Sequence, residues 1–177
     1  RSGMGMPQHD QEGRLLRADF DDFSLINAYF PSGNVGSVRQ DVKMQFLADI
    51  YRYVESLLPE QPRLILSGDY NICHKPIDIN HPERHKNTSG FLPEERQWID
   101  QLMGLGFHDS FRLFDNRPQQ YSWWSYRANS RARNVGWRID YHFVSEALRP
   151  RLAGAAIHPD AHHSDHCPVS IGLEQAE

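Results

Sequence analysis

The sequence predicts a layered protein of the α/β or α+β class. Several short segments have the apolar pattern of β-strands, and two longer segments have the spacing of amphipathic helices. Strands outnumber helices but both are present, which favours sheets covered by helices in a sandwich. The chain has 177 residues, of which 39% are hydrophobic and 24% charged, so it can form one globular domain with a core.

The N-terminal part is expected to hold two strands and one long helix. Gly13–Phe20 and Phe23–Phe30 are strand-like, and the residues before them show no period and are expected to be irregular. Proline and glycine then break the chain. Apolar residues spaced three and four apart predict a helix over Val38–Leu58, with Ser37 as its N-cap.

The remainder of the chain is expected to alternate loops, a helix and short strands. Arg63–Leu66 is a short apolar run, which predicts a buried strand, and His74–Gly90 is a polar loop. Pro93 followed by two glutamates favours a helix start, and Gly106 would close that helix. Further strands are expected at Ser110–Phe111, Tyr121–Trp124, Ile139–Val144 and Val169–Leu173.

Composition excludes several classes of protein. No stretch approaches the roughly 20 apolar residues of a membrane helix, so no membrane partner is expected. Cys73 and Cys167 are the only cysteines, which favours free thiols in a reducing compartment over a disulfide framework. The net charge is −4, yet the segment from Arg112 to Arg138 holds six arginines and a single acid, Asp115. This local positive charge suits a polyanionic partner, whereas the net charge of the whole chain does not.

Three polar sites lie at the ends of predicted strands, where a rigid scaffold tends to hold functional groups. Asp69 and Asn71 follow the third strand, Asp140 lies in the strand Ile139–Val144, and Asp165 with His166 precedes the last strand. One such aspartate would more often cap a turn, but three together favour a function. Carboxylate and amide oxygens suit Mg²⁺ or Mn²⁺, and a further carboxylate can take a proton from water. These groups therefore predict phosphoryl transfer.

A zinc site is the alternative chemistry, because His162, His163 and Cys167 are zinc-type ligands in the same stretch. Ligands packed into six consecutive residues would point in conflicting directions, and no standard zinc spacing is present. The hard-cation interpretation is therefore favoured over zinc.

Aromatic residues alternate with arginines from Tyr121 onward, a composition that suits phosphates and an unstacked base or sugar. Alternation along a strand places one of Trp123 and Trp124 in the core. Arg131 and Arg133 are predicted to contact DNA phosphates. So dense a run of arginines without acids is unusual for an ordinary solvent-exposed face.

Five short motifs run through the chain: Asn27-Ala28-Tyr29-Phe30-Pro31, Ser67-Gly68-Asp69-Tyr70-Asn71, Gly90-Phe91-Leu92-Pro93-Glu94-Glu95-Arg96, Asn134-Val135-Gly136-Trp137-Arg138-Ile139-Asp140-Tyr141 and Ser164-Asp165-His166-Cys167-Pro168-Val169. Through them the sequence, from about Gly13 to Leu173, resembles the exonuclease III family of apurinic/apyrimidinic endonucleases. That family belongs to the endonuclease/exonuclease/phosphatase superfamily. The third and fourth motifs point to its DNA-repair branch. The resemblance implies a single domain over residues 1–177 with a partial four-layer αββα sandwich.

The resemblance also implies roles for five catalytic residues. Tyr29 would contact the scissile phosphate, and Asp69 would activate the attacking water. Asn71 would orient that water and the phosphate. Asp140 would pair with His166 at the reacting group.

The implied metal shell includes Asp165 together with Asp69 and Asn71, around Mg²⁺ or Mn²⁺. In the family an earlier glutamate is the principal metal ligand, and nothing before Tyr29 matches the strand that carries it. Glu12 lies at the start of a later strand of the family's fold and therefore does not correspond to that glutamate. We therefore expect the chain to be the C-terminal portion of such a domain, without its N-terminal strands.

The implied partner is double-stranded DNA with abasic sites. Trp123 and Trp137 would wall the pocket for the extruded abasic sugar, and the loop around Asn87 would touch the DNA backbone. Extrusion costs least where no base is stacked. The expected activity is incision at abasic sites, with 3′-to-5′ exonuclease or 3′-phosphodiesterase action. The competing hypotheses are a non-catalytic DNA-binding fragment and a hydrolase of another phosphodiester. The expected location is the bacterial cytoplasm and nucleoid, or the nucleus in a eukaryote.

Overall fold

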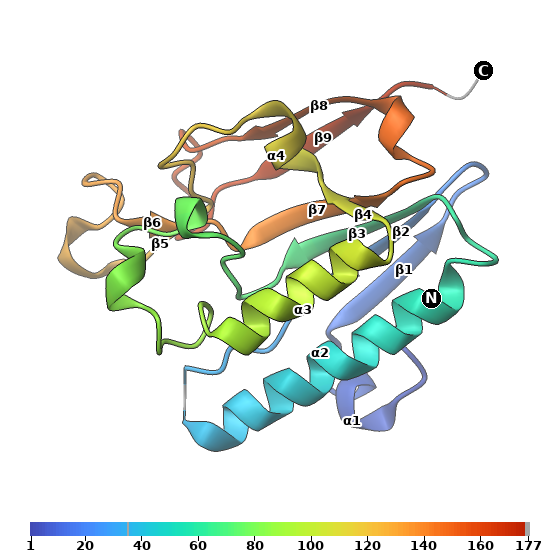
Figure 1. Ribbon diagram of the computed structural model, residues 1–177, viewed down its shortest axis with the longest axis horizontal. Coiled ribbons are helices and arrows are strands. Elements are labelled where there is room, and N and C mark those ends of the chain that lie inside the picture. The colour runs from blue at the N-terminus through green and yellow to red at the C-terminus, as the bar shows by residue number, and fades with distance from the viewer. Residues whose placement is uncertain (35, 176–177) are drawn as a thin grey trace.

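A computed structural model of the protein describes residues 1–34 and 36–175 and confirms a mixed α/β fold (Figure 1). Its main sheet has the strand order β1-β2-β3-β7-β4. Strands β2 and β3 run parallel, and the other neighbours pair antiparallel. The five strands are β1 (Leu15–Asp19), β2 (Ser24–Ala28), β3 (Leu64–Asp69), β7 (Asp140–Ser145) and β4 (Phe107–Asp109).

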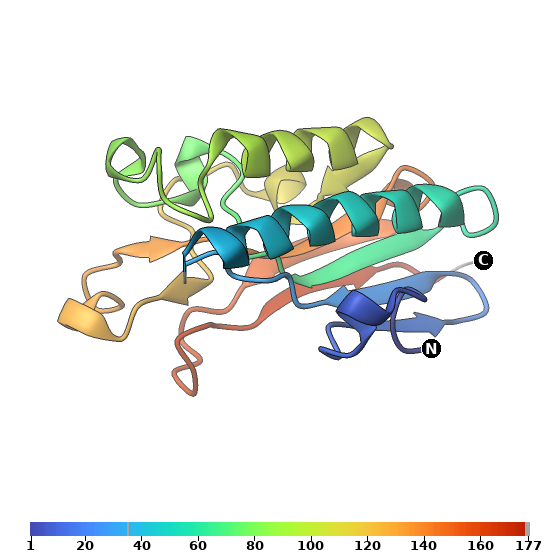
Figure 2. The ribbon, with the colours of Figure 1, turned by 90° about the horizontal axis from the view of Figure 1, so that it is seen from below.

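Helices α2 (Ser37–Leu57) and α3 (Pro93–Gly104) cover one face of this sheet (Figure 2). Both were predicted, and the main hydrophobic core lies between them and the sheet. In α3 the Glu95 carboxylate accepts a hydrogen bond from the Leu92 N–H at 3.0 Å, which supports the helix start. In α2 the predicted cap is wrong. Gly36 is the N-cap, and no side chain satisfies the first turn.

A second, two-stranded sheet of β8 (Leu152–Ile157) and β9 (Val169–Leu173) lies on the opposite face of the main sheet (Figure 2). Alternating strand positions place Leu25 and Ile65 on the face toward this second sheet. Leu25 from the main sheet and Ile171 from the second sheet both pack against a small cluster of Ile65, Val144 and Leu148. The helix–sheet–sheet part of the expected sandwich is therefore present.

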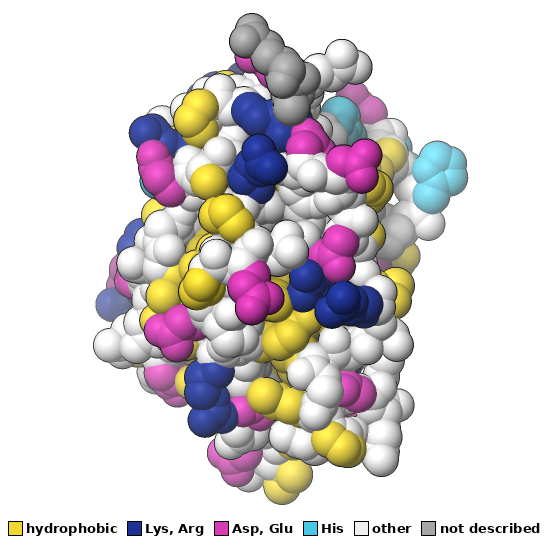
Figure 3. All heavy atoms as spheres, turned by 90° about the vertical axis from the view of Figure 1, so that its right-hand side faces the viewer, with side chains coloured by type: hydrophobic (Ala, Val, Ile, Leu, Met, Phe, Trp, Pro, Cys, Tyr) yellow, Lys and Arg dark blue, Asp and Glu magenta, His cyan; other side chains and the backbone are white. Residues whose placement is uncertain are grey.

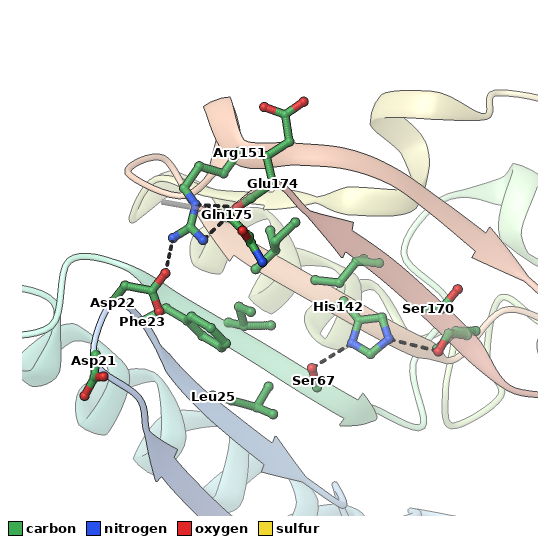
Figure 4. A pocket seen from close by; sticks show the side chains of 14 residues that line it. Asp21, Asp22, Phe23, Leu25, Ser67, His142, Arg151, Ser170, Glu174 and Gln175 are labelled. Atoms are coloured by element: carbon green, nitrogen blue, oxygen red, sulfur yellow. Dashed lines mark hydrogen bonds and ion pairs between the residues drawn. The ribbon is translucent and has the colours of Figure 1, made fainter. Parts of the chain in front are cut away.

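An open groove of about 830 Å³ separates the two sheets (Figure 4). One wall holds Leu25 and Ile65, and β9 supplies the other. Within it the His142 ring bridges the Ser67 hydroxyl, at 2.7 Å, and the Val169 carbonyl, at 3.1 Å. Figure 3 shows the end of the molecule that lies on the right of Figure 1, where apolar side chains reach the surface among charged ones.

The structure differs from the sequence expectations in five elements. Ser110–Phe111 is not a strand but part of helix α4 (Ser110–Phe114), because the Asp109 carboxylate accepts from the Arg112 N–H and caps a helical turn. The segment before Gly13 is not wholly irregular, since it contains α1 (Pro7–Asp10). Strands β4, β6 (Gly136–Trp137) and β8 were not predicted.

The remaining elements are short. Strands β5 (Trp123–Trp124) and β6 (Gly136–Trp137) form a separate two-stranded ribbon. Single 3₁₀ turns occur at η1 (Pro76–Asp78), η2 (Pro82–Arg84), η3 (Arg127–Asn129) and η4 (Arg149–Arg151). Among the residues that the structure describes, no helix combines the length and apolar character needed to cross a membrane.

Candidate active site

The pairing of β3 with β7 brings two of the predicted carboxylates together. Asp69, the last residue of β3, is the direct cross-strand partner of Asp140, the first residue of β7. Gly68 permits the close approach of β2 at this point. Its φ is +136°, and a Cβ there would lie 1.9 Å from the Ala28 carbonyl oxygen.

The loop before β9 brings His166 onto this carboxylate pair. Its Nδ1 lies 2.9 Å from Asp140 Oδ2, and its Nε2 lies 4.0 Å from Asp69 Oδ2. A bridge between His166 and Trp123 aligns the loop with β5. The predicted pairing of Asp140 with His166 is therefore present in the geometry.

Burial and like charge shift the acid–base properties of this cluster. Burial, followed by the negative charge of Asp140, raises the pKa of Asp69 from 3.8 to about 6. Burial of the His166 ring acts to lower its pKa, but the hydrogen bond and charge of Asp140 outweigh it, so the pKa lies above its usual value. The cluster therefore pairs a carboxylate whose pKa is about 6 with an imidazole whose cationic form Asp140 favours.

Asn71 sits in a strained turn that two other elements hold. Its φ is +51°, and its backbone N–H donates to Asp69 Oδ1 at 2.8 Å. Its side-chain amide donates to the Phe30 carbonyl at 2.9 Å. Its own carbonyl accepts from Lys43 Nζ at 2.8 Å. Lys43 in turn forms a fully buried ion pair of 2.6 Å with Glu95. The turn that places Asn71 beside Asp69 is thus anchored to α2 and α3.

These groups line a cavity of about 350 Å³ at one end of the main sheet. The cavity brings together seven of the predicted site residues, namely Tyr29, Asp69, Asn71, Trp123, Trp137, Asp165 and His166. Asp140 joins them through its hydrogen bond to His166. Tyr29 follows β2 directly, and its ring is half exposed at the mouth under the guanidinium of Arg14, 5.0 Å away.

The two tryptophans form one wall of the cavity. Their side chains meet edge to face with ring centroids 6.0 Å apart. Trp123 Nε1 donates to Asp165 Oδ2 at 2.9 Å. Among the described residues, the acids and histidines within ligand distance of one another are Asp69, Asp140 and His166, all within 4.8 Å. Asp165, which was predicted in the metal shell, is not in this group. Asn71, the predicted amide ligand, lines the same cavity.

The zinc alternative is not supported by the geometry. His162 and His163 are exposed, whereas Cys167 is buried. Burial raises the pKa of the Cys167 thiol to about 11, which disfavours the thiolate that zinc requires. The described residues include no metal-ligand grouping that contains these three side chains.

The predicted DNA-contacting side chains fall into two sets. Asn87 and Arg133 are exposed, and Arg133 makes one long contact, 3.5 Å, to the Ala128 carbonyl. Arg131 instead donates three hydrogen bonds to backbone carbonyls. Arg138 is buried and pairs with Asp109 at 2.6 Å. The basic composition of this segment therefore overstates the positive charge available to a ligand.

Sequence reasoning missed four polar residues that line the cavity, Ser32, Asn34, Thr88 and Ser89. The Ser89 hydroxyl donates to Gln40 Oε1 at 2.7 Å. A run of small hydroxyl residues beside Gly90 was the available signal, but such runs are common in turns.

The sequence matches the Endonuclease/Exonuclease/phosphatase family over residues 2–166. It is 42% identical to the DNA repair nuclease APEX1 of Danio rerio, over 97% of this chain and 55% of that protein. It is 41% identical to an exodeoxyribonuclease of Bacillus subtilis, over 96% of this chain and 67% of that protein. The chain thus spans about half to two thirds of the length of these relatives.

Solved structures give the same result. A 3′-5′ exonuclease from Neisseria meningitidis matches with a TM-score of 0.93 and 28% identity, over 99% of this chain and 70% of that one. An AP endonuclease from Archaeoglobus fulgidus matches with a TM-score of 0.88 and 25% identity, over 98% of this chain and 70% of that one. The chain therefore belongs to the endonuclease/exonuclease/phosphatase family and, within it, to the exonuclease III and AP endonuclease branch.

Proposed function

We propose that the protein hydrolyses phosphodiester bonds of double-stranded DNA at abasic sites, with Mg²⁺ or Mn²⁺ as its cofactor. The observation that carries this proposal is the cluster of Asp69, Asp140 and His166 beneath a cavity walled by two tryptophans. A 3′-to-5′ exonuclease or 3′-phosphodiesterase action on the same bond type is part of the proposal. The names of the relatives support it, because they include AP endonucleases and exodeoxyribonucleases.

Four residues of the chain have separate roles in the proposed hydrolysis. Asp69, ionised above pH 6, accepts the proton of the attacking water. Asn71 orients that water. His166, whose cationic form the hydrogen bond to Asp140 favours, stabilises the charge that develops on the phosphoryl oxygens. The hydroxyl of Tyr29 contacts the phosphate from the mouth of the cavity.

The donor set fits a hard divalent cation. Asp69 and Asp140 are adjacent carboxylates, and their mutual repulsion contributes to the raised pKa of Asp69. These carboxylates would hold such a cation and its charge would relieve that repulsion, with Asn71 and Asp165, which line the same cavity, as further oxygen donors. When bound, Mg²⁺ supplies a Lewis acid that neutralises charge on the phosphoryl group.

The cavity suits a sugar without a base. Its volume of about 350 Å³ is at the lower end of small-molecule sites. Trp123 and Trp137 offer ring surfaces at its wall, and exposed Asn87 and Arg133 are the proposed contacts to the DNA backbone. Because one hydrophobic core joins the main sheet to both long helices, we also propose that residues 1–177 form a single domain.

The test is incision of a labelled duplex that carries one abasic analogue. Cleavage is expected at that site in Mg²⁺ or Mn²⁺, and its loss in EDTA. An undamaged duplex of the same sequence is the control for substrate choice. DNA binding without cleavage in either metal would instead support the non-catalytic alternative. Activity that only Zn²⁺ restores would overturn the proposed cofactor.

A further inference from the structure

Two residues of the active site follow a segment that has no regular secondary structure. Asp165 and His166 lie in the connection from β8 to β9, and residues 158–164 of this connection form no strand or helix. Backbone hydrogen bonds to other segments support the two ends of this stretch, from the His158 N–H to the Pro168 carbonyl at 2.9 Å and from the Trp124 N–H to the Asp165 carbonyl at 2.9 Å. Between these ends, side-chain contacts must hold residues 159–164.

The guanidinium of Arg131 holds this segment. Its Nη1 donates to the Ser164 carbonyl at 2.7 Å. Its Nη2 donates to the carbonyls of Pro159, at 2.8 Å, and Ala161, at 2.7 Å. Its Cζ atom lies 4.6 Å from the centroid of the buried ring of Trp124. One side chain thus ties three backbone carbonyls of the connection to the loop between β5 and β6.

The chemistry of this contact favours arginine. Three carbonyl acceptors around one planar group match the fixed fork of guanidinium donors, and the flat face can stack on an indole. A lysine ammonium would keep the charge but could not make the same fork and stack. The neighbouring Arg133 is different, because it is exposed and makes one contact of 3.5 Å.

We propose that Arg131 is a positioning residue, which holds the 158–164 segment so that Asp165 and His166 reach the site. This inference rests on the proposed function for its catalytic consequence. It replaces the phosphate contact expected from the sequence, because three of the four Nη–H donors already bind carbonyls. Displacement of a catalytic group by about 1 Å can reduce the rate roughly 100-fold.

The experiment compares Arg131→Gln and Arg131→Lys with Arg151→Gln. Arg151 is the matched control, since its guanidinium also donates to a backbone carbonyl, that of Glu174, but far from the site. Both Arg131 variants should lower single-turnover incision at saturating DNA roughly 10- to 100-fold. The salt dependence of DNA affinity should stay unchanged. Amide hydrogen exchange should accelerate in residues 158–167 and not elsewhere. The Arg151 control should keep wild-type incision.

Each readout has a defined contrary outcome. A salt slope reduced by about one unit, with unchanged exchange in 158–167, would show that Arg131 contacts a phosphate and would overturn the inference. Full incision by Arg131→Lys would show that charge alone suffices, which also overturns it. If the wild-type protein cleaves no DNA, the proposed function fails, while the exchange measurement still decides whether Arg131 holds the segment.

Discussion

Replacing Asp69 with asparagine should stabilise the metal-free protein at alkaline pH even though it removes the proposed base. The folded pKa of Asp69 is about 6 against an ordinary value of 3.8. Because the folded pKa is raised, the wild type has its full stability from this group below pH 3.8 and loses it as pH rises through 6. At about 1.4 kcal/mol per pKa unit, the loss approaches about 3 kcal/mol at pH 8.

Asparagine removes this penalty and keeps most of the local hydrogen bonds. Its amide oxygen can still accept from the Asn71 N–H, which is 2.8 Å from Asp69 Oδ1. The weaker contact of 3.2 Å from the Asn71 side-chain amide to Asp69 Oδ2 is lost, at a cost of about 1 kcal/mol. The variant should therefore be about 2 kcal/mol more stable than the wild type at pH 8 and roughly 0.5 kcal/mol less stable at pH 4.

Urea unfolding at both pH values, in EDTA, measures this reversal. The exposed Asp41 supplies a control, Asp41→Asn, for the loss of one negative charge. A variant that is less stable than the wild type at pH 8, or a difference of the same size at both pH values, would refute the reasoning about the carboxylate pair.

Three further changes test other parts of the structure. Lys43→Met leaves Glu95 buried without its cation and should lower the free energy of unfolding by about 3–5 kcal/mol in urea; a loss below about 1 kcal/mol would contradict this. Gly68→Ala places a Cβ against the Ala28 carbonyl and should cost several kcal/mol, so a wild-type melting temperature would show that the strands can separate there. Arg133→Gln should reduce the salt slope of DNA binding by about one unit, and an unchanged slope would mean that this arginine faces solvent in the complex.

Much of the fold could be predicted because periodicity and strand-end chemistry are local properties of the sequence. The helix over α2 and the strand Val169–Leu173 follow from their apolar spacing. Strand β8 was missed because Ala153, Gly154 and Ala155 have little intrinsic preference for a strand, and only pairing with β9 selects that conformation. Ser110–Phe111 was assigned wrongly because the capping carboxylate of Asp109 decides between strand and helix there.

The sequence could predict which residues belong to the site but not which of them lie next to each other. Asp69, Asp140 and His166 were singled out because each lies where a strand meets a loop. That Asp69 faces Asp140 depends on the register of β3 with β7, which no local pattern encodes. The same limit applies to Arg131. Its charge is evident in the sequence, whereas the carbonyls that accept its hydrogen bonds lie 28 to 33 residues away.

The most direct test of the account is single-turnover incision of an abasic duplex by Asp69→Asn and by His166→Ala, with DNA affinity measured in parallel. Both groups act mainly on the transition state, so each variant should lose about 3 kcal/mol or more of its stabilisation, roughly 100-fold or more in rate. DNA affinity should change much less. Near-normal turnover in either variant would contradict the assignment of the Asp69, Asp140 and His166 cluster as the hydrolytic centre.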